Sequence, residues 1–330
     1  MPGQPVKVII PVAGIGTRMR PHTHTAPKGL LHVAGKPILG HILDRLNKID
    51  ISEIIFIIGF LGEKIADYVK KNYKFKSRFV YQEELKGLGF ALHLVSPKVK
   101  KDEPVLIILG DTIIEANLGP VLKRKQNALG THWVDDPRRF GIVEKEKGWV
   151  KRLVEKPEHP TSHQAIVGLY YITDTWLLKE CLKEIVSKNI RTRGEYQLTD
   201  ALQLMINRGA KFSTFNIDGW YDCGKPETLL ETNQHLLSKM KLKRKIPGSV
   251  LIPPVYVSPT AKIIDSVVGP FVSVADDAVI RSSIIRNSII GEESEVNFCL
   301  LESSLIGIAA NVFGTYQKLN VGDSSVVGFY

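Results

Sequence analysis

Apolar and polar positions follow two different periods along the N-terminal part of the chain. Short runs of consecutive apolar residues predict buried strands, and segments with apolar residues on one face predict amphipathic helices between them. The predicted strands lie at 8–10, 53–58, 78–82 and 105–109, with helices at 37–49 and 63–71. Strands and helices that alternate in this way predict an α/β fold with a doubly wound, mostly parallel sheet.

The pattern changes at residue 131, where strands begin to follow one another directly. Turn residues separate predicted strands at 131–134, 141–145, 150–155 and 166–172. These strands predict an antiparallel extension that covers one end of the sheet. The remaining elements are helices at 175–186, 198–207 and from 226 to about 239, and a strand at 211–216. A first domain is therefore predicted at 1–240.

A repeat with a period of five to six residues fills the last part of the chain. One column of the repeat is apolar and consists of Ile263, Val268, Val274, Ile280, Ile285, Ile290, Val296, Leu301, Ile306 and Val312. A smaller residue lies two positions before each of these, at Ala261, Ser266, Val272, Ala278, Ser283, Ser288, Ser294, Cys299, Ser304 and Ala310. This period is typical of a hexapeptide β-helix, and irregular hairpins explain the consecutive matches poorly. These repeats predict about three coils within a β-helix at 251–330, after a linker at 241–250.

Composition indicates a soluble globular protein. The 330 residues are 44% hydrophobic and 24% charged, and no apolar run is long enough to span a bilayer. No signal-peptide pattern opens the chain, and Cys181, Cys223 and Cys299 are far apart, which predicts a reduced, cytoplasmic protein. The net charge of +10 suits polyanionic small substrates. Nucleic-acid binding is not expected, because the lysines do not interleave with aromatic residues.

The first predicted strand runs into a glycine loop that suits an anion. Gly14 and Gly16 allow close approach of backbone N–H groups, and Arg18 and Lys28 follow them. The loop lacks the Gly-Lys-Ser/Thr of a Walker A motif, and Pro21 and Pro27 disfavour the helix that a dinucleotide fold needs. An ordinary strand–helix turn with chance charges explains this ordered set less well than a loop that wraps a polyphosphate. Arg20 is a weaker candidate.

Ligands in doubly wound sheets lie beyond the carboxyl ends of the strands. The glycine loop, Gln82 and Asp111 each follow a predicted strand of the sheet. The pattern alone therefore predicts that these three segments meet at one edge.

The motifs Gly-x-Gly-Thr-Arg, Arg-Pro-x-Thr and Pro-Lys resemble the signature of the sugar-phosphate nucleotidyltransferases, or NDP-sugar pyrophosphorylases. The resemblance covers nearly the whole chain, since the repeats are similar to the left-handed β-helix of some members. It implies a Rossmann-like catalytic domain at 1–240 and a left-handed β-helix at 251–330. It also implies Mg²⁺-dependent transfer from a nucleoside triphosphate to a sugar 1-phosphate, with pyrophosphate released.

The choice of substrates within the family stays open. The chain most resembles glucose-1-phosphate thymidylyltransferases, which implies dTTP and glucose 1-phosphate. The segment 11–14 is closer to the uridylyl branch, whereas 19–21 is closer to the thymidylyl and guanylyl branches. UTP with glucose 1-phosphate, and GTP with mannose 1-phosphate, are therefore the alternatives.

The resemblance implies a nucleotide and metal site. Arg18 and Lys28 would contact the triphosphate as catalytic residues, and Asp111 and Asp222 would hold Mg²⁺. The implied nucleotide-binding residues are Ala13, Gly14, Gly16, Thr17, Gln82, Gly87 and Asp111. Taken alone, a Gln after a strand could cap the next helix, and a lone Asp there is more often a turn residue.

The resemblance also implies a sugar-phosphate site. Glu155 would accept hydrogen bonds from sugar hydroxyls, and Lys156 would neutralise the phosphate. The full implied set is Gly141, Glu155, Lys156, Gly168, Tyr170 and Arg193. Without the surrounding motifs, an exposed hairpin pair would explain Glu155 and Lys156 better.

Two other functions fit the sequence less well than nucleotidyl transfer. A non-catalytic regulatory subunit of the same architecture would be expected to lack Arg18, Lys28 or one of the aspartates, and all are present. Acyl transfer by the repeats would need a histidine base, but the last histidine, His235, precedes them. The repeats are therefore predicted to serve oligomerisation or regulation, and the protein to be a homo-oligomer without nucleic-acid or membrane partners.

Overall fold

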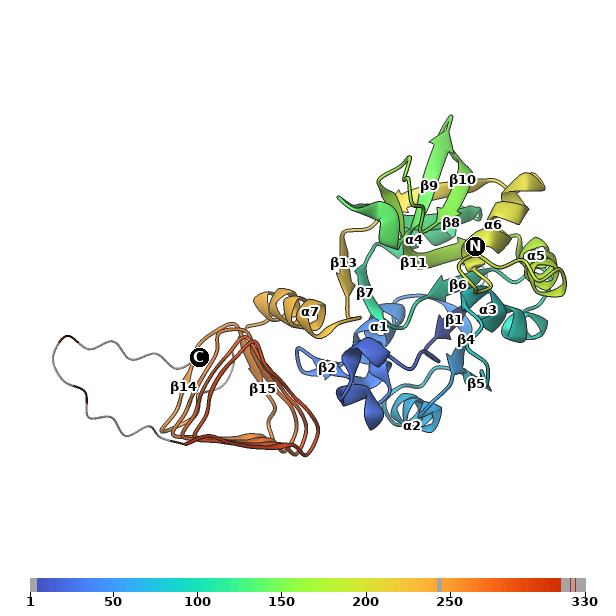
Figure 1. Cartoon of the computed structure of the whole chain (residues 1–330). Coiled ribbons are helices and arrows are strands. Elements are labelled where there is room, and N and C mark those ends of the chain that lie inside the picture. Colours follow the sequence, from blue (N-terminus) through green and yellow to red (C-terminus); the bar gives the residue numbers. More distant parts are fainter. Residues whose placement is uncertain (1–4, 242–244, 316–320, 322–323, 325–330) are drawn as a thin grey trace. The chain divides into compact units, whose positions relative to one another are not determined.

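The computed structural model describes residues 5–241, 245–315, 321 and 324. The chain divides into two compact units (Figure 1). The first unit comprises residues 1–31 and 36–232, and the second comprises 32–35 and 233–330. Within the described residues, no helix has the length and apolar character that crossing a membrane requires.

Four parallel strands form the centre of the first unit. They are β1 (Val6–Pro11), β4 (Ile51–Ile58), β5 (Ser77–Tyr81) and β6 (Val105–Ile108), in the order β5-β4-β1-β6. Consecutive residues such as Val8, Ile9 and Ile10 are at most 3% exposed. Strands β1, β4 and β6 read as nearly continuous apolar runs because both faces of the sheet are covered there, whereas the edge strand β5 is only partly buried.

The predicted antiparallel extension is confirmed. Its strands are β8 (Asn127–Trp133), β9 (Gly141–Glu146), β10 (Trp149–Glu155) and β11 (Gln164–Ile172). Strand β11 pairs antiparallel with β6, β8 and β9, and β12 (Phe212–Asn216) pairs parallel with β8. The result is one nine-stranded mixed sheet. A separate antiparallel ribbon joins β7 (Thr112–Glu115) to β13 (Gly219–Asp222).

The helices agree with the pattern except at short elements. They are α1 (Ile38–Leu46), α2 (Gly62–Asn72), α3 (Leu88–Val95), α4 (Leu118–Lys123), α5 (Thr175–Ser187), α6 (Leu198–Asn207) and α7 (Pro226–Ser238). Helix α1 ends three residues earlier than predicted, because the chain leaves it in a turn where Ile49 N–H donates to Leu46 O. The sequence pattern did not predict α3 and α4, whose eight and six residues are too few to show a clear period.

The second unit is the predicted left-handed β-helix. Three parallel sheets of four strands each run β14-β17-β20-β23, β15-β18-β21-β24 and β16-β19-β22-β25. The strands are β14 (Val250–Leu251), β15 (Val255–Val257), β16 (Lys262–Ile264), β17 (Val267–Val268), β18 (Val272–Val274), β19 (Val279–Arg281), β20 (Ile284–Arg286), β21 (Ile289–Ile290), β22 (Glu295–Asn297), β23 (Leu300–Glu302), β24 (Leu305–Ile306) and β25 (Asn311–Phe313). The ten recognised repeats are strands β16 to β25, which make a little over three coils as predicted, and β14 and β15 add two strands before them.

Both columns of the repeat point into the β-helix. The apolar column includes Val268, Ile280 and Ile285, and each of these is fully buried. The smaller column lies at the corners, where the preceding residue often has a positive φ, as at Ser282 and Asn287. Hydroxyls of this column bond between successive coils, since Ser283 N–H donates to Ser266 Oγ at 3.1 Å. Small residues are required here because the chain turns inward with little room.

An ion network joins the amino-terminal ends of the parallel strands. Lys7 Nζ lies 3.3 Å from Glu53 Oε2, 3.1 Å from Glu103 Oε2 and 2.9 Å from Lys98 O. Arg78 Nη2 also contacts Glu53 at 2.9 Å. Burial alone would raise the pKa of both carboxyls, but the hydrogen bonds and charges of their partners hold each pKa below its ordinary value.

Replacing the central cation should destabilise the first unit in a pH-dependent way. Lys7→Met leaves two buried carboxylates without their shared partner, so the free energy of unfolding should fall by about 3–5 kcal/mol at neutral pH. Both carboxylates stabilise the native protein above their unfolded pKa, and this contribution is lost as pH falls through the lower native pKa. In the variant the carboxylates bind protons more readily, so the difference from wild type should narrow towards about pH 4.

Urea unfolding of both proteins across this pH range measures the effect. The matched control is Lys151→Met, which removes an exposed pair with Glu146 and should cost less than about 1 kcal/mol. If the free energies of unfolding of wild type and Lys7→Met differ by the same amount at every pH, the assignment of the network is contradicted.

Candidate active site

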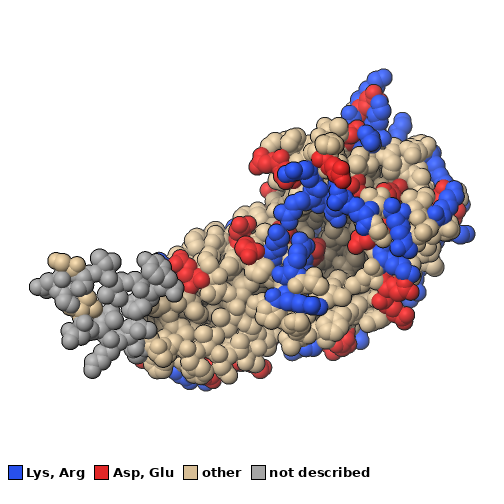
Figure 2. Space-filling model, viewed as in Figure 1, with Lys and Arg blue, Asp and Glu red and all other residues tan. Residues whose placement is uncertain are grey.

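The carboxyl ends of three parallel strands bring the predicted nucleotide-side segments together. The glycine loop follows β1, Gln82 follows β5, and Asp111 lies just beyond the end of β6. Because β1 pairs in parallel with β4 and β6, and β4 with β5, these ends meet at one edge of the sheet. Figure 2 shows lysine and arginine side chains gathered around a hollow in the surface.

The glycine loop is held from within while part of it stays open. Gly16 has φ +69°, and a Cβ there would lie 3.1 Å from both Lys28 Cβ and Thr23 Cγ2. Thr23 Oγ1 donates to Gly16 O at 2.9 Å, and Thr17–Met19 form a 3-10 turn, η1. A Cβ at Gly14 would meet nothing within 4 Å. Packing therefore demands glycine at Gly16, whereas the space beside Gly14 is available to a ligand.

Lys28 and Asp111 form an ion pair at the base of the site. Lys28 begins the 3-10 turn η3 (Lys28–Leu30), and its Nζ lies 2.8 Å from Asp111 Oδ2. The Lys28 side chain is 10% exposed and that of Asp111 is 46% exposed. Burial opposes ionisation of Asp111, but the charge and hydrogen bond of Lys28 hold the pKa of this carboxyl below its usual range. Asp111 is thus an ionised carboxylate with a face towards solvent.

The β7–β13 ribbon brings the second predicted aspartate to the first. Asp222 pairs with Thr112, the residue after Asp111, and Cys223 N–H donates to Asp111 O at 3.2 Å. A Cβ built on Gly224 would lie 2.8 Å from Asp222 Oδ1 and 3.2 Å from Arg18 Nη2. Both predicted catalytic cations and both predicted metal ligands therefore gather in one place, although they are up to 204 positions apart (222 − 18).

The donor set fits Mg²⁺ better than a metal that needs a complete protein cage. Asp111 and Asp222 offer hard carboxylate oxygens at the same end of the ribbon. Within the described part of the chain, no group of three or more His, Cys, Asp and Glu side chains is arranged to hold a metal ion. Mg²⁺ is usually bound by one or two carboxylates, with water and substrate phosphates completing its shell.

Gln82 and Gly87, both predicted to bind the nucleotide, have structural roles in their own loops. Gln82 is 5% exposed, and its Nε2 donates to Glu84 O at 2.9 Å. The alternative that it caps the next helix does not hold, because Gly87 is the N-cap of α3. Gly87 has φ +99°, and a Cβ there would lie 2.7 Å from Tyr196 O. A close backbone approach therefore requires glycine at this position, whatever it binds.

The predicted sugar-side residues form a second cluster around Glu155. Gly141 pairs with Glu155 across strands β9 and β10, and a Cβ on Gly141 would lie 3.0 Å from Glu155 Oε2. Lys156 Nζ lies 3.4 Å from Glu155 Oε1. Lys156 has φ +43°, and Arg193 Nη2 donates to its carbonyl at 2.7 Å. The contact from Arg193 stabilises a backbone conformation that is costly for a residue with a side chain.

Thr199 belongs to this cluster, although no sequence motif pointed to it. Its Oγ1 donates to Glu155 Oε2 at 2.7 Å from the first turn of α6. Tyr170 in β11 is 5% exposed, and burial together with the charge of Glu155 raises the pKa of its hydroxyl. Gly168 is held elsewhere, because its carbonyl accepts Leu109 N–H at 3.0 Å, which joins β11 to the residue after β6.

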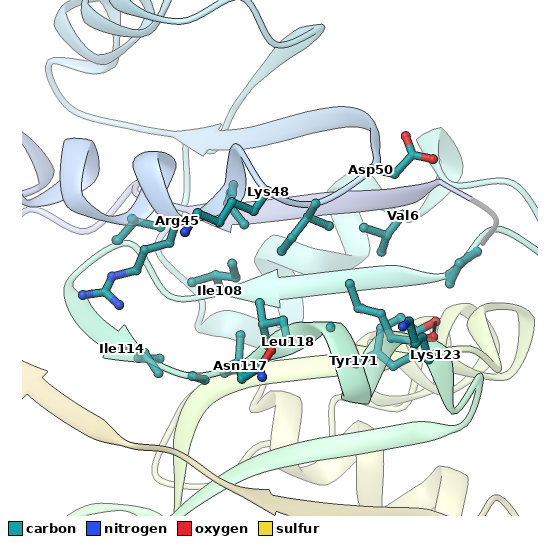
Figure 3. A pocket seen from close by; sticks show the side chains of 18 of the residues that line it. Val6, Arg45, Lys48, Asp50, Ile108, Ile114, Asn117, Leu118, Lys123 and Tyr171 are labelled. Carbon is teal, nitrogen blue, oxygen red and sulfur yellow. Dashed lines mark hydrogen bonds between the residues drawn. The ribbon is translucent and has the colours of Figure 1, made fainter. Parts of the chain in front are cut away.

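A cavity of about 720 Å³ lies apart from these residues. Side chains of α1, β6, α4 and β11 line it, among them Arg45, Ile108, Leu118 and Tyr171 (Figure 3). None of the predicted site residues is among its lining residues. The candidate active site is therefore the edge that carries the glycine loop, not this cavity.

Comparison with known proteins agrees with the geometry. A family model described as nucleotidyl transferase matches residues 7–239. A UTP–glucose-1-phosphate uridylyltransferase of Haloferax volcanii is 34% identical over 242 residues, which cover 70% of this chain and 96% of that protein. A glucose-1-phosphate thymidylyltransferase of Streptomyces antibioticus is 30% identical over 358 residues, covering 98% of this chain and 99% of that protein. A solved UDP-glucose pyrophosphorylase bound to UDP-glucose superposes with a TM-score of 0.61 at 25% identity, covering 72% of this chain and all of its own.

The contact between Gly168 and Leu109 should limit substitution in β11. Gly168 has φ +81°, and a Cβ there would lie 2.6 Å from Leu109 Cδ1, so Gly168→Ala should lower the free energy of unfolding by about 3 kcal/mol. Gly148 has φ +86° but open space around it, so Gly148→Ala should cost only about 1 kcal/mol. Urea unfolding measures the stability of both variants. Equal losses of stability would show that backbone strain, and not the contact with Leu109, sets the cost of the substitution.

Proposed function

This chain belongs to the nucleotidyl transferase family as a sugar-1-phosphate nucleotidyltransferase, and we propose that its preferred substrates are dTTP and glucose 1-phosphate. One observation carries the choice: among the relatives that align along nearly the whole chain, two are named glucose-1-phosphate thymidylyltransferases. The uridylyltransferase relative is slightly more identical but aligns over a shorter part. UTP is therefore the second candidate nucleotide.

The chemistry of the family sets the demands on the site. An oxygen of the sugar 1-phosphate attacks the α-phosphorus of the nucleotide, and pyrophosphate leaves with the electrons of the broken P–O bond. Both reactants are polyanions, so the protein must bring like charges together and stabilise charge on the leaving group. Positioning and fixed cations meet these demands without a covalent intermediate.

We assign the leaving-group side to Arg18 and Lys28. Lys28 is a buried point charge already held by Asp111, so little reorganisation is needed when the triphosphate binds. Arg18, beside Gly224, would offer its planar fork to phosphate oxygens. Backbone groups of Ala13, Gly14, Gly16 and Thr17 would contact the nucleotide, and Gln82 and Gly87 would lie against the base.

Asp111 and Asp222 would hold Mg²⁺. When bound, Mg²⁺ neutralises phosphate charge and polarises the phosphoryl oxygens. Lys28 keeps Asp111 ionised and leaves its second oxygen to Thr112 and to the ligand. Gly224 N–H donates to Asp222 Oδ1 at 2.9 Å and thereby orients the second carboxylate.

The cluster around Glu155 would bind the sugar phosphate. Thr199 bonds to one oxygen of Glu155, which orients the carboxylate to accept sugar hydroxyls. Lys156 would neutralise the phosphate from a turn that Arg193 supports. Gly141, Gly168 and Tyr170 would line the pocket.

The predicted domains are assigned separate roles. We propose that 1–240 is the catalytic domain, 241–250 a linker and 251–330 a module for oligomerisation or regulation in a cytoplasmic homo-oligomer. A non-catalytic regulatory subunit is the rival. The gathering of Arg18, Lys28, Asp111 and Asp222 in one place favours the enzyme.

The substrate proposal is tested by pyrophosphate release. With Mg²⁺ present, dTTP, UTP and GTP are each combined with glucose 1-phosphate and with mannose 1-phosphate. We expect kcat/KM for dTTP with glucose 1-phosphate to exceed every other pair by at least about tenfold. Preference for UTP or GTP would move the protein to another branch. No release from any pair, with nucleotide binding retained, would instead support the regulatory subunit.

The metal assignment is tested by Asp111→Asn. The amide keeps the shape of the side chain but loses its charge, so kcat should fall by about 100-fold and half-saturation should need more Mg²⁺. Asp67→Asn on the exposed side of α2 is the control and should change neither quantity. An unchanged Mg²⁺ requirement in Asp111→Asn would remove this residue from the metal site.

A further inference from the structure

We propose that Asn233 is a positioning residue for Lys28 and acts through residues 32–35, here called turn 32–35. The inference rests on the proposed function, in which Lys28 stabilises the leaving pyrophosphate. Turn 32–35 begins only four residues after Lys28, yet it clusters with the β-helix unit rather than with the unit that contains Lys28.

Turn 32–35 is anchored firmly within the second unit. Val33 is fully buried and Ala34 is 3% exposed. Ala34 N–H donates to Asn233 Oδ1 at 2.9 Å, and His32 Nε2 lies 3.1 Å from Glu292 Oε1. A Cβ on Gly35 would lie 2.6 Å from Tyr256 Cζ, so this glycine is packed directly against the Tyr256 ring.

The backbone of the turn needs such support. Ala34 has φ +46° and Gly35 has φ +86°, so two consecutive residues adopt the left-handed conformation. A side chain makes this conformation costly at Ala34, and a hydrogen bond to its N–H offsets that cost. The contact from Asn233 therefore acts on the residue at which the turn is most strained.

The side-chain amide of Asn233 is held by burial and by three hydrogen bonds. Its side chain is fully buried in α7, and its Nδ2 donates to Phe271 O at 3.1 Å. Its Oδ1 accepts both Ala34 N–H and Ser273 Oγ, the second at 2.5 Å. One amide thus joins turn 32–35 to a strand and a corner of the β-helix.

The chain passes this constraint to Lys28. Leu31 N–H donates to Lys28 O at 3.1 Å, and Ile38 N–H donates to Leu31 O at 3.0 Å. Leu31 is therefore tied to η3 on one side and to the start of α1 on the other, and the next residue is His32. Anchoring of turn 32–35 fixes one end of a short segment whose other end carries the ammonium group that pairs with Asp111.

The neighbouring residue on α7 provides a matched control. Gln234 Nε2 donates to Asn287 Oδ1 at 2.7 Å, so this amide also bonds to the β-helix, but at a site other than turn 32–35. Gln234→Ala removes a contact of the same kind from the same helix. A difference between Asn233→Ala and Gln234→Ala therefore reports the contact with the turn.

The test is a double-mutant cycle on pyrophosphate release by the full chain. Asn233→Ala should lower kcat by about tenfold with the KM for the sugar 1-phosphate unchanged, because a small displacement of Lys28 weakens stabilisation of the transition state. Gln234→Ala should leave kcat unchanged. In a Lys28→Ala background, Asn233→Ala should cause no further loss, since its effect runs through Lys28.

Several outcomes would overturn the inference. An equal loss in wild-type and Lys28→Ala backgrounds would show a general structural effect, and an unchanged kcat in Asn233→Ala would show no coupling. Should Asn233→Ala unfold, Ser273→Ala removes one of the bonds that orient the same amide and should lower kcat to a smaller degree. An unchanged kcat in that variant would contradict the proposal.

Hydrogen exchange separates this inference from the proposed function. The N–H groups of Leu31 and Ile38 should lose protection in Asn233→Ala and keep it in Gln234→Ala, whether or not any substrate pair turns over. If the two variants differ in amide protection but the wild-type protein turns over no substrate pair, only the substrate assignment is rejected. Equal protection in the two variants would reject the role of Asn233 alone.

Discussion

The ion pair between Lys28 and Asp111 is the contact on which the site depends. Lys28 is buried in η3, so its ammonium group requires a carboxylate, and Asp111 supplies one from beyond the end of β6. Gly16 lies against the Lys28 side chain, and the ribbon that follows Asp111 carries Asp222. One pair thereby connects the glycine loop, the parallel sheet and the second carboxylate.

The surrounding contacts keep charges in place before a ligand arrives. Arg193 bonds to the carbonyl of Lys156, and Thr199 bonds to the carboxylate of Glu155. These contacts leave the charged groups oriented rather than free to follow solvent, which is the condition under which electrostatic stabilisation is most effective. The β-helix is stabilised differently, by its buried apolar columns and by hydrogen bonds to hydroxyl groups between its coils.

The glycines show how packing and function share single positions. Space is open beside Gly14, as expected of a residue that faces a ligand. Gly87 and Gly168 each have a positive φ and a neighbour too close for a side chain, and Gly16 combines a positive φ with tight contacts. A motif read from sequence cannot separate these causes, because it records the residue type and not what lies beside it.

Local sequence patterns were enough to predict the alternating α/β domain, the antiparallel extension, the β-helix and the segments that form the candidate site. These follow from local periods, strand ends and short motifs, all of which act over a few residues. Tertiary structure alone decided that Asp222 lies opposite Thr112, that Thr199 bonds to Glu155 and that Asn233 holds Ala34. Each of these pairs is far apart in the chain, and each contact depends on a register or a packing that no local pattern encodes.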